Sequence, residues 1–181
     1  NVMVKLSPML DITRALTELK HVSHAFIVGL EGESKEITLL LQRGFEAEPT
    51  ITAVDIKADE TPESAVSSAK SADNALPLPI ADPQQLQPST FISEPSAPYM
   101  KSALFRTIAA STGTALLHPD THLFWSKEKP EKFPGRTFQL EGIIPFDKRS
   151  LSSLAKTQAN LSVRNFPESA PALQRRLKLR D

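Results

Sequence analysis

The hydrophobic positions in the first 58 residues follow the pattern of a layered α/β fold. Runs rich in Val, Ile and Thr predict three strands, at residues 2–6, 22–30 and 50–57. The second run is nearly continuous in apolar residues, as expected for a strand that is buried on both faces. A helix capped by Asp11 or Thr13 is predicted to run to about residue 19, and a second helix is predicted over residues 33–42, with acidic residues in its first turn. The order β-α-β-α-β predicts a mostly parallel sheet of the α/β class.

Residues 59–90 differ in character from the segment before them. Five prolines lie among Ser, Ala, Asp and Gln, and the segment contains no glycine. This composition predicts a Pro-rich linker or a surface insertion, which is stiff where the prolines cluster. It is the part of the chain in which disorder is most expected.

A longer helix is predicted where the hydrophobic pattern resumes, over residues 96–112. Pro98 is tolerated in its first turn, and Gly113 lies just past its end. Apolar residues recur in it every four positions, which predicts a buried side. These residues are Met100, Leu104 and Ile108.

The last third of the chain alternates short strands and helices, which predicts small α+β modules. Strands are expected at residues 115–118, 122–125, 136–145 and 160–165. One helix is expected to begin at Asp147 or Ser150, and another after Ser169. Phe138 and Phe166 are predicted to lie in the core. The chain begins on a strand without an initiator methionine and ends where a closing strand is expected, so we interpret it as the C-terminal part of a longer protein.

The charge of the chain is split between its halves. The sequence contains 21 Lys and Arg and 21 Asp and Glu, which gives a net charge of zero. Residues 1–100 carry 7 basic and 14 acidic side chains, whereas residues 101–181 carry 14 basic and 7 acidic ones. The asymmetry indicates more than one module and makes the second half a candidate for a polyanionic partner, although solvated surface charge explains it equally well.

The composition excludes several classes of site. The chain has no cysteine, so disulfides and thiolate zinc sites are excluded, which fits a cytoplasmic protein. No apolar run approaches the roughly 20 residues needed to span a bilayer, so no membrane partner is expected. The six glycines form neither a G-x-G-x-x-G motif nor a P-loop. No catalytic or cofactor-binding residue is therefore assigned within the chain.

One segment has the residue types of a metal site. His118 and His122 are four positions apart with Asp120 between them, and two imidazoles with a carboxylate suit zinc or iron. However, the HExxH pattern is absent and the segment is not helical in pattern. Local hydrogen bonding in a turn is the favoured interpretation, and no metal is assigned.

Basic residues are the remaining chemical signal. Arg and Lys suit phosphate contacts, and interspersed rings such as Trp125 and Phe133 suit stacking on unpaired bases. A basic run at residues 175–180 is explained at least as well as the solvated end of a helix, where cations complement the helix dipole. The candidate nucleic-acid-binding residues are Lys101, Arg106, Arg136, Lys148, Arg149, Arg164 and Asn165.

Several segments of the chain carry recognisable motifs in a fixed order. They are residues 4–12 (VKLSPMLDI), 33–36 (ESKE), 91–105 (FISEPSAPYMKSALF), 118–124 (HPDTHLF), 133–136 (FPGR) and 163–167 (VRNFP). Together they resemble a family of class I S-adenosylmethionine-dependent methyltransferases that carry a THUMP-like domain at the C-terminus. Ser34 stands where that family has Cys, and the Pro-rich segment is not covered.

The resemblance implies a layout and an activity. Residues 1–58 would be the last strands and helices of a Rossmann-like methyltransferase sheet, residues 91–127 a ferredoxin-like segment, and residues 133–181 a THUMP-like domain without its closing strand. The S-adenosylmethionine loop would precede residue 1, so the chain alone is expected to be inactive. THUMP domains generally occur in RNA-modifying enzymes, which implies RNA as the partner and the methyltransferase core as a partner in cis.

Two functions remain open at this point. In the first, the chain recognises an RNA substrate with its basic half. In the second, the C-terminal domain is a scaffold that packs on the methyltransferase core, and the substrate is not RNA. Exposure of Arg136 and Arg164 on one positive face would favour the first function, and burial of both against carboxylates would favour the second.

Overall fold

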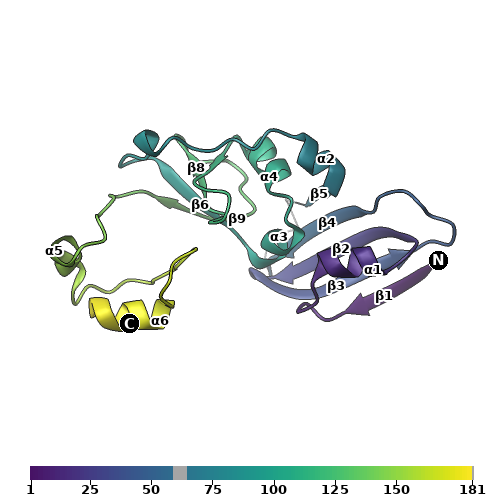
Figure 1. The fold of residues 1–181 in the computed structure, drawn as a ribbon, viewed down its shortest axis with the longest axis horizontal. Coiled ribbons are helices and arrows are strands. Elements are labelled where there is room, and N and C mark those ends of the chain that lie inside the picture. Colours follow the sequence, from purple (N-terminus) through teal and green to yellow (C-terminus); the bar gives the residue numbers. More distant parts are fainter. Residues whose placement is uncertain (59–64, 181) are drawn as a thin grey trace.

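The computed structural model of the protein describes residues 1–58 and 65–180. It is a mixed α/β structure with two sheets, as the sequence predicts. Figure 1 shows the larger sheet, the smaller sheet and a C-terminal segment with α5 and α6 following one another along the long axis. Among the described residues, none of the helices combines the length and the apolar character needed to cross a bilayer.

The larger sheet has five strands in the order β1-β3-β2-β4-β5. The strands are β1 (Val2–Leu6), β2 (Val22–Leu30), β3 (Glu33–Leu41), β4 (Thr50–Ile56) and β5 (Val66–Ala69). Only the β2–β4 pair is parallel, whereas the β1–β3, β2–β3 and β4–β5 pairs are antiparallel. The prediction of a mostly parallel sheet is therefore wrong.

The error lies in the helix predicted over residues 33–42, which is strand β3. Glu31 and Gly32 both have positive φ, 52° and 85°, the geometry of a tight hairpin turn between β2 and β3. The alternating Ile37 and Leu39 are fully buried, as a strand period requires. Glu36 pairs across the sheet with a lysine of β1 and does not begin a helix.

One face of this sheet carries the core. Ala25 and Ile27 of β2 are fully buried, whereas His24 and Phe26, which alternate with them, are half-buried. The two faces of the strand are therefore not equally buried, contrary to the prediction. Helix α1 (Ile12–Glu18) contributes Ile12 to this core. The side chain of Asp11 caps α1, in agreement with the predicted helix start.

Helix α3 (Ala97–Ser102) packs on β4, β2 and β3 of the same sheet. A Cβ at Gly29 would lie 2.6 Å from Pro98 Cγ, so the close approach of helix and strand requires a glycine at this position. The smaller sheet is thereby anchored on the larger one.

The Pro-rich segment is only partly within the described residues, since 59–64 lie outside them. From residue 65 on, the chain forms β5, helix α2 (Lys70–Ala75) and the short helix η1 (Pro83–Gln85), so it is more regular than a flexible linker, and the alternative of a surface insertion stays a prediction. Between α2 and η1, the carbonyl of Pro79 accepts from the backbone N–H of Leu116, and the N–H of Ala81 donates to the carbonyl of Leu116. These hydrogen bonds extend the edge of the smaller sheet.

The smaller sheet is antiparallel, with the order β7-β8-β6-β9. Its strands are β6 (Phe91–Pro95), β7 (Ala115–Leu116), β8 (Phe124–Ser126) and β9 (Gly135–Gln139). The helix predicted over 96–112 is two helices, because Ala103 adopts φ 53° between α3 and α4 (Phe105–Thr112). Leu104 and Ile108 are fully buried as predicted, and Met100 is half-buried.

The C-terminal segment contains α5 (Lys148–Leu151), the short helix η2 (Ser152–Leu154) and α6 (Ala170–Leu177). Both helices begin where the sequence predicts, after Asp147 and Ser169, but residues 160–165 do not form the predicted strand. Phe138 is 51% exposed and Phe166 is 37% exposed, so their assignment to the core is wrong.

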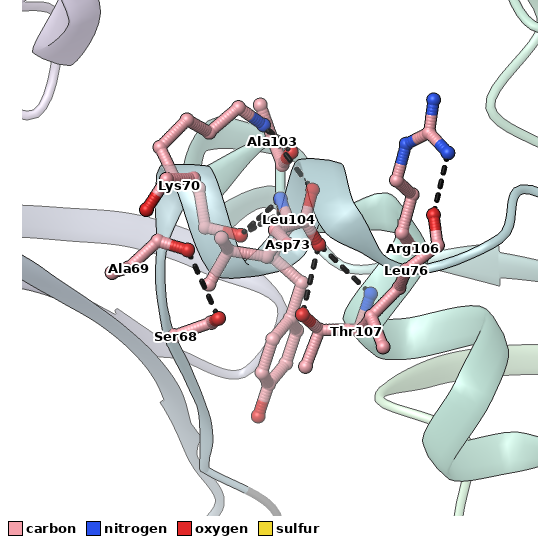
Figure 2. A network of polar contacts seen from close by, with 12 residues as sticks. Ser68, Ala69, Lys70, Asp73, Leu76, Ala103, Leu104, Arg106 and Thr107 are labelled. Atoms are coloured by element: carbon pink, nitrogen blue, oxygen red, sulfur yellow. Dashed lines mark hydrogen bonds and ion pairs between the residues drawn. The ribbon is translucent and has the colours of Figure 1, made fainter.

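A buried carboxylate ties α2 to α4 (Figure 2). The side chain of Asp73 is 2% exposed, and its Oδ1 accepts hydrogen bonds from the backbone N–H and from Oγ1 of Thr107, each at 2.8 Å. Lys70 Nζ lies 3.4 Å from the other oxygen and also donates to the carbonyl of Ala103. Because α2 directly follows β5, this network fastens the edge of the larger sheet to the helices beside the smaller one.

Replacing Asp73 with alanine should destabilise the fold. The change leaves the Thr107 N–H without its acceptor and Lys70 without its carboxylate, and hydrogen bonds to charged groups contribute about 1.5–3 kcal/mol each. We expect the free energy of unfolding to fall by about 3 kcal/mol in urea denaturation. The matched variant Asp120→Ala changes a side chain that is 70% exposed and should cost less than about 0.5 kcal/mol. Equal effects of the two variants would show that the network is not a structural tie.

Candidate functional site

A cleft of about 820 Å³ lies where the larger sheet, the smaller sheet and the C-terminal segment meet. Its walls come from the β2–β3 turn, the end of β4, the end of β6, the start of α3, the loop that leads into β9, and Arg164. The side chains on these walls include four basic and four acidic groups, beside the aromatic rings of Tyr99 and Phe133. The cleft combines charge of both signs with a partly apolar surface.

One wall of the cleft is held rigidly by Asp55, at the end of β4. Its Oδ1 accepts from the backbone N–H of Gly32 at 3.1 Å, and its Oδ2 accepts from Ser96 Oγ at 2.9 Å. The backbone N–H of Asp55 donates to the hydroxyl of Tyr99 at 3.2 Å, and the N–H of Ala97 donates to the carbonyl of Gly32 at 3.1 Å. The turn, β4 and α3 therefore form one continuous hydrogen-bonded frame.

The opposite wall is organised by Glu94, whose side chain is only 9% exposed. Its Oε2 accepts from Arg136 at 2.7 Å, and its Oε1 accepts from Arg164. Arg136 lies opposite Glu94 in the β6–β9 register, and Arg164 reaches it from the C-terminal segment. A buried carboxylate requires such partners, because an unpaired charge away from water is very costly. One carboxylate thus joins two parts of the chain.

Gly135 permits this arrangement. A Cβ at this position would lie 2.1 Å from the carbonyl oxygen of Glu94 and 2.8 Å from the Cα of Pro95. Backbone atoms cannot move aside as a flexible side chain can, so β9 approaches β6 closely enough for the Glu94–Arg136 pair only with glycine here.

The sequence-predicted residues fall into two groups. Lys101, Arg136 and Arg164 line the cleft, and each has a partner within the fold, since Lys101 Nζ donates to the carbonyl of Leu10 at 3.0 Å. Arg106 lies outside the cleft and donates to the carbonyl of Leu76 at 2.6 Å (Figure 2). The structure therefore gives four of the candidate residues an internal structural partner.

The other three candidates are exposed and do not line the cleft. Lys148 and Arg149 lie in α5, after Asp147. The backbone N–H and hydroxyl of Ser150 lower the pKa of the Asp147 carboxyl, which also caps α5. Asn165 adopts φ 47° in the loop before α6 and lines a second, more open hollow. Thus the structure brings three of the seven residues together at the cleft, and the other four do not line it.

Sequence reasoning missed the two carboxylates that organise the cleft, Asp55 and Glu94. Glu94 stands in a short strand whose neighbours Ser93 and Pro95 are buried, and a charged residue at a buried strand position needs a partner. That position was the available signal. Nothing in the linear sequence names its partners, which lie 42 and 70 residues away.

The histidine segment shows local contacts. His118 Nδ1 accepts from the backbone N–H of Asp120 at 3.1 Å, and the ring of His122 stacks on Phe105 with centroids 4.3 Å apart. Within residues 1–58 and 65–180, no group of three His, Cys, Asp or Glu side chains is arranged to hold a metal ion.

A double-mutant cycle should separate the two arginines of Glu94. The side chain of Arg164 is 35% exposed and that of Arg136 is 72% exposed, so solvent screens the second pair more. Measured against Glu94→Gln by urea denaturation, Arg164→Ala should show a coupling energy of about 1–2 kcal/mol. Arg136→Ala should show less than about 1 kcal/mol. A larger coupling for Arg136 would contradict the geometry.

Comparison with known proteins identifies the second half of the chain. Residues 91–134 match the family model of a ferredoxin-like domain, and residues 135–181 match the family model described as THUMP domain-like. Strand β9 falls in the second match but pairs with β6 in the first. Comparison with curated proteins gives no match.

One solved structure matches almost the whole chain. It is described as a "putative methyltransferase from Porphyromonas gingivalis W83", with a TM-score of 0.83 and 30% sequence identity. The match covers 99% of this chain and 45% of that chain, so the present sequence spans less than half the length of that protein. These findings confirm the resemblance carried by the motifs. From residue 91 onwards, the chain consists of a ferredoxin-like domain followed directly by a THUMP-like domain.

Proposed function

We propose that this chain is the C-terminal, substrate-recognition part of an S-adenosylmethionine-dependent methyltransferase. The observation that carries the proposal is the match over 99% of the chain to the structure described as a "putative methyltransferase", at a TM-score of 0.83. The order of motifs from residue 4 to residue 167 supports the same assignment. In this view the larger sheet is the end of a doubly wound sheet, and such sheets often carry antiparallel strands at one edge.

The residues of this chain do not fit S-adenosylmethionine. Nucleotide cofactors of doubly wound folds bind at the carboxyl ends of parallel strands, on a glycine-rich turn, with a free acidic side chain for the ribose hydroxyls. Here β2 ends in a tight hairpin turn at Gly32, and Asp55 at the end of β4 already accepts from Gly32 and Ser96. We therefore assign the cofactor to other residues of a longer protein and no step of methyl transfer to this chain.

We propose RNA as the substrate. Residues 135–181, which match the THUMP-like domain, contain nine basic and four acidic side chains. Lys148 and Arg149 are exposed in α5, where their charge is available to phosphates. This excess of exposed positive charge supports a polyanionic substrate.

A second candidate function follows from Glu94. Because Glu94 holds Arg136 and Arg164, these two arginines serve the scaffold interpretation, in which the THUMP-like domain is fixed against the rest of the chain. In that interpretation the cleft, and not the basic surface, receives the substrate, and the substrate is not RNA.

A methyl-transfer assay tests the proposal. The full-length protein that carries this chain is incubated with methyl-labelled S-adenosylmethionine and total cellular RNA, and the label in RNA is counted before and after RNase treatment. We expect RNase-sensitive label with the full-length protein and none with residues 1–181 alone. Label that appears only in protein or in small molecules would favour the scaffold interpretation, and no label in any fraction would contradict the methyltransferase assignment.

A further inference from the structure

Two exposed aromatic rings stand together on the THUMP-like domain. Phe146 is 51% exposed and Phe166 is 37% exposed, and their ring centroids lie 4.9 Å apart at an interplanar angle of 70°. The guanidinium of Arg176 lies over the ring of Phe146, 4.9 Å from its centroid. An apolar ring that is half in water usually indicates an interaction surface when it belongs to a cluster.

We propose that this cluster stacks with unpaired bases of a single-stranded RNA. Base stacking on aromatic side chains, with cation–π support from arginine, is the recurring chemistry of proteins that hold unpaired nucleotides. The choice of RNA rests on the proposed function, whereas the stacking surface rests on the geometry of Phe146, Phe166 and Arg176.

The rings are held in place by the backbone around them. The N–H of Asp147 donates to the carbonyl of Pro145 at 2.9 Å, and the Asp147 carboxylate caps α5 directly after Phe146. Arg176 is fixed by an ion pair with Glu168 at 2.5 Å. The surface is therefore formed in advance, so little side-chain freedom is lost when a base stacks on it.

The exposed positive charge near the two rings favours a negatively charged partner. Lys148 and Arg149 follow Phe146 by two and three residues and are exposed, and Arg175 is exposed beside Arg176 on α6. These cations lie close to the rings in the sequence, and their exposed charge attracts phosphates. A strand of nucleotides supplies both a planar face for the rings and the negative charge for their surroundings.

An open hollow lies beside the ring of Phe166. It is about 600 Å³ in volume and is lined by Val163 and by residues 165–169, including Asn165 and Phe166. The amide of Asn165 can donate and accept hydrogen bonds, as the edge of an unpaired base requires. Arg164, on the same loop, lines the cleft and is held by Glu94. The Glu94–Arg164 pair thus places the stacking surface beside the cleft.

The test compares two strands of equal charge. A labelled single-stranded RNA of about 12 nucleotides, the scale of one single-strand binding surface, and an abasic ribose-phosphate strand of the same length are titrated against the chain in fluorescence anisotropy. Because bases stack favourably on aromatic rings, the chain should bind the RNA at least about tenfold more tightly than the abasic strand. The variants Phe146→Leu and Phe166→Leu should each lose about fivefold or more in affinity for the RNA and none for the abasic strand.

Phe138→Leu is the matched control. Phe138 is equally exposed and also lies under an arginine, with the Arg136 guanidinium 5.6 Å from its centroid, but it is not part of the cluster. Its substitution should change the affinity less than about twofold, and unchanged thermal unfolding of each variant shows that the fold is intact. Equal affinity for both strands, the absence of binding, or equal losses in all three variants would overturn the proposal. A shift from dimer to monomer in sedimentation for the Phe146 and Phe166 variants would also overturn it, in favour of an interface between copies.

The result of this RNA-binding test can be distinguished from the result of the methyl-transfer assay. RNA methylation by the full-length protein without an effect of the Phe146 and Phe166 variants on RNA binding would refute the stacking surface alone. Base-dependent binding by the chain without methyl transfer would leave the stacking surface intact and refute the assigned activity.

Discussion

The arrangement of the molecule depends on one buried carboxylate that is shared by two arginines. Glu94 ends a strand of the ferredoxin-like domain, and both Arg136 and Arg164 belong to the THUMP-like domain. A carboxylate shielded from water is stable only with such partners, so the wall of the cleft and the position of the C-terminal segment are set by the same interaction. Exposed ion pairs seldom have this influence, and the burial of Glu94 makes the difference.

A second frame holds the other side of the cleft. Here the contacts are the hydrogen bonds that the Asp55 carboxylate accepts from Gly32 and Ser96, the close packing of Pro98 on Gly29, and the network around Asp73. The two frames meet at the end of β6, where Glu94 and Ser96 are two residues apart. The larger sheet, the smaller sheet and the C-terminal segment are therefore coupled through a few polar contacts in addition to their hydrophobic cores.

Prediction from sequence succeeded where a pattern is local. The buried pair Leu104 and Ile108, the start of α1 and the strands β2 and β4 follow directly from periodicity and capping. It failed at β3, where acidic residues indicated a helix start although they lie opposite β1 and β2 in a sheet. The basic residues Arg136 and Arg164 were recognised as candidates from the sequence, but their pairing with Glu94, 42 and 70 residues away, is a long-range contact that no local pattern indicates.

The pairing of β9 with β6 joins the two matched segments within one sheet. The two family matches meet between residues 134 and 135, inside a sheet and not in a linker. A chain divided at that point would leave β6 with a bare edge, ready to pair with another strand. The boundary between the two family matches is therefore not a boundary between two independent sheets, because β9 of the second match completes the sheet of the first.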